Sequence, residues 1–486
     1  MISRTTQSLL GAVAVLAIAV GVAEAHPPTS QAAVSGTTVR TAVQNTALVC
    51  PPPLQGGGGT VYSLAVPGSP SATSTSGGAA LSPLTAQGTA QALVQQSAIG
   101  GSTTAKAAAG AKAPALSATA NGAAAPGFTV QQTTTSTDHT LSGTGCTAPG
   151  TDFWFVGADS DKSSSDYIEL TNTEDTASDA DIHIFNSAGE VENSQAANLD
   201  IPANGTLSLS LAGLLSPFNT NTSLAVHVVV HTGRIAAALH EQSGNGDDWL
   251  PATTLGTTQI IPGLPADVTD ATLVVDDTGA TDADLNIQLA SETGWITPAG
   301  HESIQVKAGT ASSVDLGAIT HGEAAALRLT PASGTGVPAV PVVAGIQVVR
   351  GGGSGDIGYL AGDAAPIGQR ATVAGNTAGD STLLLTATGT AATVKVSSIG
   401  ASGGTPTVQN VSIQAGSTVS VALKAPPGGG TFAATIEPVS GGPVHAARMI
   451  SRKSGSSLGF TIQEVSDDHS TVQIPHVVQD GSVVLP

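Results

Sequence analysis

Two heptapeptides indicate the fold of this chain: SDADIHI at residues 178–184 and TDADLNI at residues 281–287. In both, apolar residues alternate with polar ones, which is the period of a half-buried β-strand. The same order of features recurs three times along the chain: an apolar strand, a polar loop, an alternating strand and a Gly-Thr or Gly-Ser turn. The turn glycines Gly205, Gly309 and Gly416 lie about 105 residues apart, close to the size of one immunoglobulin-like sandwich. The sequence predicts an all-β chain of tandem immunoglobulin-like antiparallel β-sandwich domains.

The length of 486 residues is too great for one hydrophobic core, so several domains are expected. A stretch at 69–125, rich in Ser, Thr, Ala, Gly and Gln, is expected to be a loose low-complexity insert. Junctions between repeats are expected near 251–265 and 361–375. The predicted domains are a signal peptide at 1–25, a small N-terminal β-domain containing the insert at 26–145, and sandwich repeats at 146–255, 256–366 and 367–486.

The N-terminus has the features of an export signal. Arg4 supplies positive charge, an apolar run extends from Leu9 to Ala23, and Ala23-Glu24-Ala25 fits a small-x-small cleavage site. A membrane crossing needs about 20 apolar residues, more than this run provides. Cleavage after Ala25 is therefore the preferred prediction, and an uncleaved anchor is the alternative. The predicted location is secreted or cell-surface, with membrane contact only through this segment.

Charge is scarce and mostly acidic. The net charge is −20, only 10% of residues are charged, and 3% are aromatic. An acidic chain without basic patches argues against partners such as nucleic acid or an anionic lipid surface.

The two cysteines, Cys50 and Cys146, are expected to form one disulfide in an oxidising compartment. Closing a loop of about 100 residues would stabilise the fold by about 4–5 kcal/mol in the chain-entropy account. Two free thiols are the alternative. A zinc site is not favoured, because neither cysteine has a second Cys or a His at ligand spacing.

Two short motifs resemble catalytic signatures. Residues 277–280 read Asp-Thr-Gly-Ala, but an aspartic protease needs two such aspartates sharing a proton, and this chain has one copy beside Asp276. We expect a solvated turn there. Residues 400–404 and 455–459 match Gly-x-Ser-x-Gly, yet no helix is predicted after either serine, as a nucleophile elbow requires.

Three histidines could gather on one sheet face. His227 and His231 lie four residues apart on a predicted strand, and His183 lies on a neighbouring one. Alternation would direct Val226, Val228 and Val230 to the core and the histidines outward. A solvated strand face is the default expectation, and a transition-metal site is the alternative.

Two pairs of aspartates occupy equivalent places in the first two repeats. Asp179 with Asp181, and Asp282 with Asp284, could bind calcium, but the third repeat has Ala391 and Thr393 there. Polar turns and edges are the preferred interpretation. No metal or cofactor is predicted.

Trp249 and Trp295 are the candidate ligand or interface residues. Trp249 follows Asp248 in a predicted junction loop and could stack on a sugar ring or a partner. Packing between domains is the more common role for such a residue.

Several stretches resemble a known family. Cys50-Pro51, the run CTAPGTDFWFVG at 146–157, GRIAA at 233–237 and DWLP at 248–251 are similar to the secreted actinobacterial family of unknown function numbered 5719. The resemblance extends from the signal segment to near the C-terminus. It implies an exported, envelope-associated protein from a high-GC Gram-positive bacterium. The family has no assigned reaction, so the resemblance transfers no catalytic residue.

The sequence as a whole predicts a non-enzymatic structural or interaction module at the cell envelope. The expected partner is a cell-wall polymer or another envelope protein. Two alternatives remain open: a carbohydrate-binding module protein, and an envelope hydrolase with a dispersed active site.

Overall fold

A computed structural model describes residues 39–474, apart from 55–56, 70, 73, 108–112, 161–165, 193, 217–222, 244–245, 333–338, 352–354, 364 and 456. The chain divides into two compact units, one of residues 42–471 and one that combines residues 1–41 with 472–486. In the second unit, β1 (Val39–Ala42) pairs with β37 (Thr471–Ile474). The predicted signal peptide at 1–25 lies outside the described residues. Among the helices that are described, none has the length and apolar character to cross a membrane.

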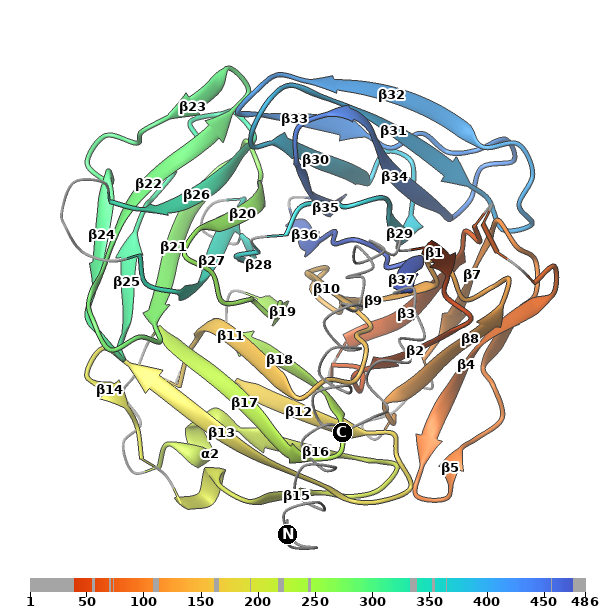
Figure 1. Cartoon of the computed structure of the whole chain (residues 1–486), viewed down its shortest axis with the longest axis horizontal. Helices are drawn as coiled ribbons and strands as arrows, with labels where there is room; N and C mark the ends of the chain where they lie inside the picture. Colours follow the sequence, from red (N-terminus) through yellow and green to blue (C-terminus); the bar gives the residue numbers. More distant parts are fainter. Residues whose placement is uncertain are drawn as a thin grey trace, which may run out of the picture. The chain divides into compact units, whose positions relative to one another are not determined.

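The unit of residues 42–471 is built from eight antiparallel sheets that pack in pairs, in sequence order (Figure 1). Each pair encloses one large apolar cluster, which is the arrangement of a β-sandwich. We number the sandwiches I to IV.

Sandwich I contains β2 (Asn45–Cys50), β3 (Gly57–Val66), β4 (Gly77–Thr85), β5 (Gly88–Thr89), β6 (Val94–Gln96), β7 (Gly101–Lys106), β8 (Leu116–Gly122), β9 (Thr129–Ser136) and β10 (Leu141–Gly145). Sandwich II contains β11 (Asp152–Ala158), β12 (Tyr167–Asn172), β13 (Ser178–Asn186), β14 (Gly189–Glu190), the 3-10 turn η1 (Ser194–Ala196), β15 (Leu199–Ile201), β16 (Gly205–Ser210), the one-turn helix α2 (Leu211–Leu214), β17 (Leu224–Thr232), β18 (Ile235–Ser243) and β19 (Gly246–Leu250).

Sandwich III contains β20 (Gln259–Leu264), β21 (Val268–Asp277), β22 (Ala283–Ser291), β23 (Gly294–Ile296), β24 (Ser303–Val306), β25 (Ala311–Asp315), β26 (Ala325–Pro331), β27 (Val342–Arg350) and β28 (Asp356–Ala361). Sandwich IV contains β29 (Ala371–Asn376), β30 (Ser381–Ala387), β31 (Ala392–Ile399), β32 (Thr407–Ile413), β33 (Ser417–Ala422), β34 (Phe432–Gly441), β35 (Val444–Ser454) and β36 (Ser457–Glu464).

All four sandwiches share one strand order. In sandwich III one sheet runs β20-β26-β22-β23 and the other β25-β21-β27-β28, and the other three sandwiches repeat this plan. We call the sheet that contains the first strand of a sandwich its first-strand sheet. The other sheet, which contains the final strand, is its last-strand sheet. The all-β antiparallel prediction is confirmed. The immunoglobulin-like part is not, because a constant-type immunoglobulin domain keeps its first two strands in one sheet, whereas β20 and β21 lie in different sheets.

The N-terminal region differs from the expected loose insert. Residues 69–125 contain β4 to β8, and these strands follow the same plan as the later sandwiches. Their inward positions are filled by small or aliphatic side chains, with Ala79, Leu81, Ala118 and Ala120 in the core. Alternation of Ala with Ser or Thr gives a weak hydrophobic period, which explains why the sequence did not indicate a fourth sandwich.

The expected junctions also contain regular structure. β20 lies within the predicted junction at 251–265, and β29 lies mostly within the one at 361–375. The domain boundaries drawn after residues 145, 255 and 366 fall between the final strand of one sandwich and the first strand of the next.

Alternation along the strands determines which side chains form the cores. In β17, Val226, Val228 and Val230 are buried in the core of sandwich II, while His227 and His231 point to the other face. The predicted orientation of these valines and histidines is confirmed.

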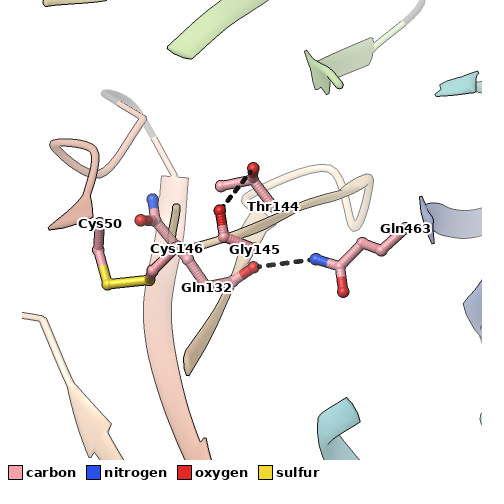
Figure 2. Close-up of a disulfide and its surroundings, with 6 residues drawn as sticks. All are labelled: Cys50, Gln132, Thr144, Gly145, Cys146 and Gln463. Atoms are coloured by element: carbon pink, nitrogen blue, oxygen red, sulfur yellow. Dashed lines mark hydrogen bonds between the residues drawn. A yellow bond between two sulfur atoms is a disulfide. The ribbon is translucent and has the colours of Figure 1, made fainter. Parts of the chain in front are cut away.

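The disulfide between Cys50 and Cys146 is present and confirms the predicted pairing (Figure 2). It joins the end of β2 to the residue after β10, so it ties the two sheets of sandwich I together. The bond is buried in the core of that sandwich. Close to the disulfide, the side-chain amide of Gln463 in β36 donates a hydrogen bond to the Gln132 carbonyl of β9 at 3.5 Å. This bond joins sandwich IV to sandwich I.

Sandwiches pack through a repeated kind of junction. The first-strand sheet of II contacts the last-strand sheet of III through β11 with β21 and β27. The same relation links III to IV through β20 with β30 and β35, and IV to I through β29 with β3 and β9. By this rule the first-strand sheet of I should cover the last-strand sheet of II, but among the described strands no comparable contact joins these two sheets.

The final strands of the four sandwiches meet one another. β10 contacts β19 and β36, and β28 contacts the same two strands. Each of these strands lies at the edge of its sheet. The edges that would be open in separated sandwiches are therefore brought together.

Candidate functional site

The meeting point of the final strands is held by two buried aspartates. Asp248 of β19 accepts hydrogen bonds from the Gly143 amide of β10 at 2.9 Å and from the Thr461 hydroxyl of β36 at 3.1 Å. Asp356 of β28 accepts from the amides of Leu141 in β10 at 3.0 Å and Phe460 in β36 at 2.9 Å. Each carboxyl group thus bonds to strands of two other sandwiches. We call Asp248 and Asp356 the carboxylate clamp.

The clamp supplies hydrogen-bond acceptors to backbone N–H groups of the edge strands. An edge strand leaves a row of unpaired N–H groups, and burying such a group without a partner is costly. Asp248 and Asp356 are 0% exposed and supply acceptors at this place. They also accept from the amides of their own next residues, Trp249 and Ile357.

Burial dominates the proton affinity of both groups. It raises the pKa of Asp248 well above its ordinary value, against the lowering effect of the amide hydrogen bonds. It raises the pKa of Asp356 to about 7, again opposed by the amides of Leu141, Phe460 and Ile357. Desolvation penalises the charged form, and the donors favour it.

The final strands approach one another closely at the centre. A side chain at Gly459 would overlap the carbonyl oxygen of His139, and a Cβ at Gly143 would lie 2.6 Å from the Gln463 amide. Arg448 is also fully buried there, and its guanidinium donates to the Ala374 carbonyl at 2.7 Å. We interpret the carboxylate clamp as a set of structural bonds between sandwiches, whereas Arg448 joins the two sheets of sandwich IV.

A second polar cluster lies on the outer face of the last-strand sheet of sandwich II. Alternation in β12 directs Ile168 and Leu170 into the core and leaves Tyr167 and Glu169 on the opposite face. The strand registers place Tyr167 opposite His240 and His240 opposite Trp249. Residues paired in this way project to the same side of a sheet.

These three residues form an aromatic row across β12, β18 and β19. The rings of Tyr167 and His240 are stacked with centroids 5.5 Å apart, and His240 meets Trp249 edge-on at 5.0 Å. Burial increases along the row, from the partly exposed Tyr167 to His240 at 7% and Trp249 at 3% exposure. Two ring nitrogens in the row, His240 Nδ1 and Trp249 Nε1, are buried without a hydrogen-bond partner.

A carboxylate borders the aromatic row. Glu169 is 8% exposed, accepts a hydrogen bond from the exposed Ser208 hydroxyl at 2.8 Å, and lies 3.7 Å from His240 Nε2. Ser208 does not serve as a triad nucleophile in this arrangement, because it contacts the carboxylate directly and no imidazole stands between them.

The two tryptophans singled out from the sequence occupy different surroundings. Trp249 belongs to β19 and to the aromatic row, so it is part of a strand instead of a junction loop. Trp295 belongs to β23, where the Arg328 guanidinium lies 3.6 Å from its ring centroid. The turn of Gly416 in sandwich IV approaches the same ring so closely that a Cβ there would overlap it. Trp295 therefore lies at the junction of sandwiches III and IV.

The structure brings two of the three candidate histidines together. His183 and His227 are opposite each other, with ring centroids 5.9 Å apart, and His227 stacks on Trp154 at 3.9 Å. His231 is separate and pairs with Asp181 at 2.9 Å. His183 and His227 bond to carboxylates as well, Glu190 at 2.6 Å and Asp152 at 3.1 Å.

Acidic candidates also have ordinary hydrogen-bond partners. Asp181 accepts from the Asn198 amide at 2.6 Å, and Asp282 accepts from the Ala308 amide at 3.0 Å. Within the described residues, no three His, Cys, Asp or Glu side chains gather closely enough to hold a metal ion.

The Asp-Thr-Gly-Ala motif differs in part from the expected solvated turn. Asp276 and Asp277 end β21 and are both 0% exposed. Asp277 accepts from the Gly279 amide at 2.7 Å, whereas neither carboxyl oxygen of Asp276 has a partner. Burial raises the pKa of Asp276 to about 7, with a further rise from Asp277. The expected turn is present and partly exposed at 278–280, but the two acids before it are buried at the strand end, which the local sequence does not reveal.

The two Gly-x-Ser-x-Gly serines lack the elbow geometry. Ser402 is exposed in the turn after β31, and Ser457 begins β36. A nucleophile elbow joins a strand to a helix, and neither serine precedes a described helix.

Sequence reasoning missed Tyr167, Glu169, Ser208 and His240, as well as the role of Asp248 and Asp356. The cross-strand register that assembles them is not contained in any local motif. The alternation of Tyr167 and Glu169 with Ile168 and Leu170 was the available signal, since it separates a core face from a free face.

Comparison with known proteins gives a family and no activity. The model of a family of unknown function, DUF5719, matches residues 103–424, which is more than half of the chain. No curated protein matches the sequence. The crystal structure of Streptomyces avermitilis alpha-L-rhamnosidase complexed with L-rhamnose aligns at 9% identity over 88% of this chain, with a TM-score of 0.13. The alignment spans 57% of the rhamnosidase chain, and so low a score carries no argument about fold or function.

Proposed function

Because the chain belongs to the family of unknown function DUF5719, we propose a function from its architecture: it is a non-catalytic structural or interaction module of the cell envelope. The carboxylate clamp is the observation that carries this proposal. Two fully buried acids, Asp248 and Asp356, bond sandwiches to one another, and neither Gly-x-Ser-x-Gly serine has the elbow geometry.

The repeated sandwiches support a role as a spacer that presents surfaces. Four sandwiches of one strand order, joined through their final strands, offer several sheet faces and edges from one body. Sheet faces and edges are the surfaces by which immunoglobulin-like and similar β-modules bind partners. Function resides in such sites and not in the fold itself.

Export is part of the same proposal. The signal-like segment at 1–25 and the disulfide suit a secreted or cell-surface protein of an actinobacterium, with membrane attachment only if the segment stays uncleaved. Mass spectrometry of the N-terminus of protein collected from culture medium tests this, and a mature chain starting at His26 is expected. Intact protein found only in the cytosol would contradict export.

A paired assay separates binding from catalysis. We expect the purified chain to be retained by cell-wall polymer or by an envelope protein, and to leave generic ester and peptide substrates and the polymer unchanged. Sustained turnover that one side-chain substitution abolishes would overturn the proposal in favour of an envelope hydrolase.

A carbohydrate-binding role is the second candidate, and the aromatic row favours it. Tyr167 supplies a partly exposed ring surface, backed by the buried rings of His240 and Trp249, and Glu169 and Ser208 supply polar groups beside it.

A further inference from the structure

The last-strand sheet of sandwich II is the one such sheet that lacks a sandwich partner among the described strands. The corresponding sheets of III, IV and I are each contacted by a neighbouring first-strand sheet. The face that remains carries Tyr167, Glu169, His240 and Trp249. In contrast to a solvated sheet face, these residues include aromatic rings and buried polar atoms.

We propose that this face is a binding site for a neutral saccharide. The inference rests on the proposed function as an interaction module, and it names the ligand class of that module. The saccharide would lie against the exposed end of the aromatic row, at Tyr167 and Ser208, with its hydroxyl groups reaching Glu169 and His240.

The chemistry of the row suits a ring with apolar faces and a hydroxyl rim. An aromatic ring offers a flat apolar surface, and Trp and Tyr also supply one polar group each. His240 Nδ1 and Trp249 Nε1 are 93% and 97% buried by residue and have no partner. Buried polar atoms in this condition are rare in proteins and call for an explanation. Hydroxyl groups can both donate and accept, so a polyol suits the Glu169 carboxylate and the Ser208 hydroxyl at the exposed end of the row.

The charge of the face selects a neutral ligand. The outward residues of β12, β16 and β18 are Thr171, Glu169, Tyr167, Thr206, Ser208, Ser210, Ala236, Ala238, His240 and Gln242, and Asp247 of β19 lies opposite Gln242 on the same face. Glu169 and Asp247 are the carboxylates in this set, and the set contains no Lys or Arg. An anionic polymer would meet Glu169 and the overall charge of −20 without a compensating cation. Ligands that donate hydroxyl hydrogens to Glu169 fit the face.

Binding is tested by affinity electrophoresis of the purified full-length protein in native gels that contain soluble polysaccharide. The neutral probes are dextran and mannan, and the anionic probe is alginate. We expect at least one neutral polymer to retard the protein and alginate not to do so. Retardation by alginate alone, or by none of the three, would overturn the proposal.

Variants then locate the site. Tyr167→Ala should weaken retention by about three- to tenfold, the range for loss of one aromatic contact, and Glu169→Gln should weaken it by a comparable factor. Phe185→Ala is the matched control, because Phe185 is a partly buried aromatic on the outer face of the other sheet of sandwich II. Equal weakening by Phe185→Ala and Tyr167→Ala would refute the location.

Trp249→Ala is not a suitable test of binding, because Trp249 is buried and removal of its ring is expected to destabilise the sheet. Trp249→Phe keeps the ring and removes Nε1–H, so a variant that retains its thermal transition and loses affinity supports the assigned role. The proposed non-catalytic function has a different test: hydrolysis of the polymer by the protein would overturn that function even if the aromatic row binds a saccharide. If an envelope protein binds the chain and neither dextran nor mannan retards it, the role as an interaction module is supported and the saccharide site is rejected.

Discussion

Single carboxyl groups hold together parts of the chain that are more than a hundred residues apart. Asp356 reaches Leu141 and Phe460, and Asp248 reaches Gly143 and Thr461. Such a group acts as a cross-link because the amides it accepts would otherwise be buried without partners.

Removal of Asp356 should therefore destabilise the protein strongly. Asp356→Ala leaves the amides of Leu141 and Phe460 without acceptors, and we expect a loss of about 2–5 kcal/mol in the free energy of unfolding. Asp200→Ala, an exposed aspartate of β15, should change it by less than about 0.5 kcal/mol. Urea unfolding of both variants measures the difference, and equal stabilities would contradict the role of the clamp.

Asp276 should make stability depend on pH in a defined direction. Burial raises its pKa to about 7, whereas an aspartate in the unfolded chain titrates near pH 4, about its ordinary value. The folded protein thus retains a proton that the unfolded chain releases. The contribution is fully present below about pH 4 and is lost as the pH rises to about 7.

The variant Asp276→Asn removes this titration. Its free energy of unfolding should fall less than that of the natural chain between about pH 4 and about pH 7. Thermal unfolding followed across that range provides the measurement. Identical profiles for the two proteins would show that Asp276 does not carry the proton.

At the scale of elements, strands in the middle of sheets were predictable and the final strands of the sandwiches were not. Leu224 to Val230 and Leu285 to Leu289 alternate clearly and lie in β17 and β22. β19, β28 and β36 were missed, because their sequences mix glycine and acid with apolar residues. Each pairs with a neighbouring strand of its own sheet and also contacts final strands of other sandwiches, and such tertiary context decides strand formation where the local sequence is ambiguous.

The aromatic row illustrates the same limit. Trp249 was a candidate from its residue type alone, but its partners Tyr167 and His240 come from other strands and are defined only by register. Cys50 and Cys146 could be paired from the sequence, because two cysteines allow one intramolecular bond.

The disulfide stabilises sandwich I as an element. Its sequence separation of 96 residues corresponds to about 4–5 kcal/mol of chain entropy in the unfolded state. Replacing both cysteines by serine should lower the midpoint of thermal unfolding under non-reducing conditions. Adding a reductant should lower the midpoint of the natural chain and leave that of the double variant unchanged; a reductant effect on the variant would contradict this account.

The unit of residues 42–471 is expected to unfold as one body. Its sandwiches share the clamp and the contacts of β10, β19, β28 and β36, so the loss of one removes partners from the others. Differential scanning calorimetry should give one transition with equal calorimetric and van't Hoff enthalpies.

The matched variant combines Asp248→Ala with Asp356→Ala. Without the two acceptors, the sandwiches should melt in separate steps or over a broader range. Several transitions in the natural chain would contradict the idea of a single cooperative body.

Asp356 accepts hydrogen bonds from β10 in the first sandwich and from β36 in the fourth, so one carboxyl group joins an early and a late part of the chain. A nascent chain interrupted before Ser457 contains all the strands up to β35, but it lacks β36 and the hydrogen bond from the Phe460 amide to Asp356. Ribosomal stalling, premature stop codons and C-terminal clipping should therefore yield products that proteases and quality control remove, although most of their residues are present. β36 is therefore needed to complete a centre whose other strands are all synthesised before it.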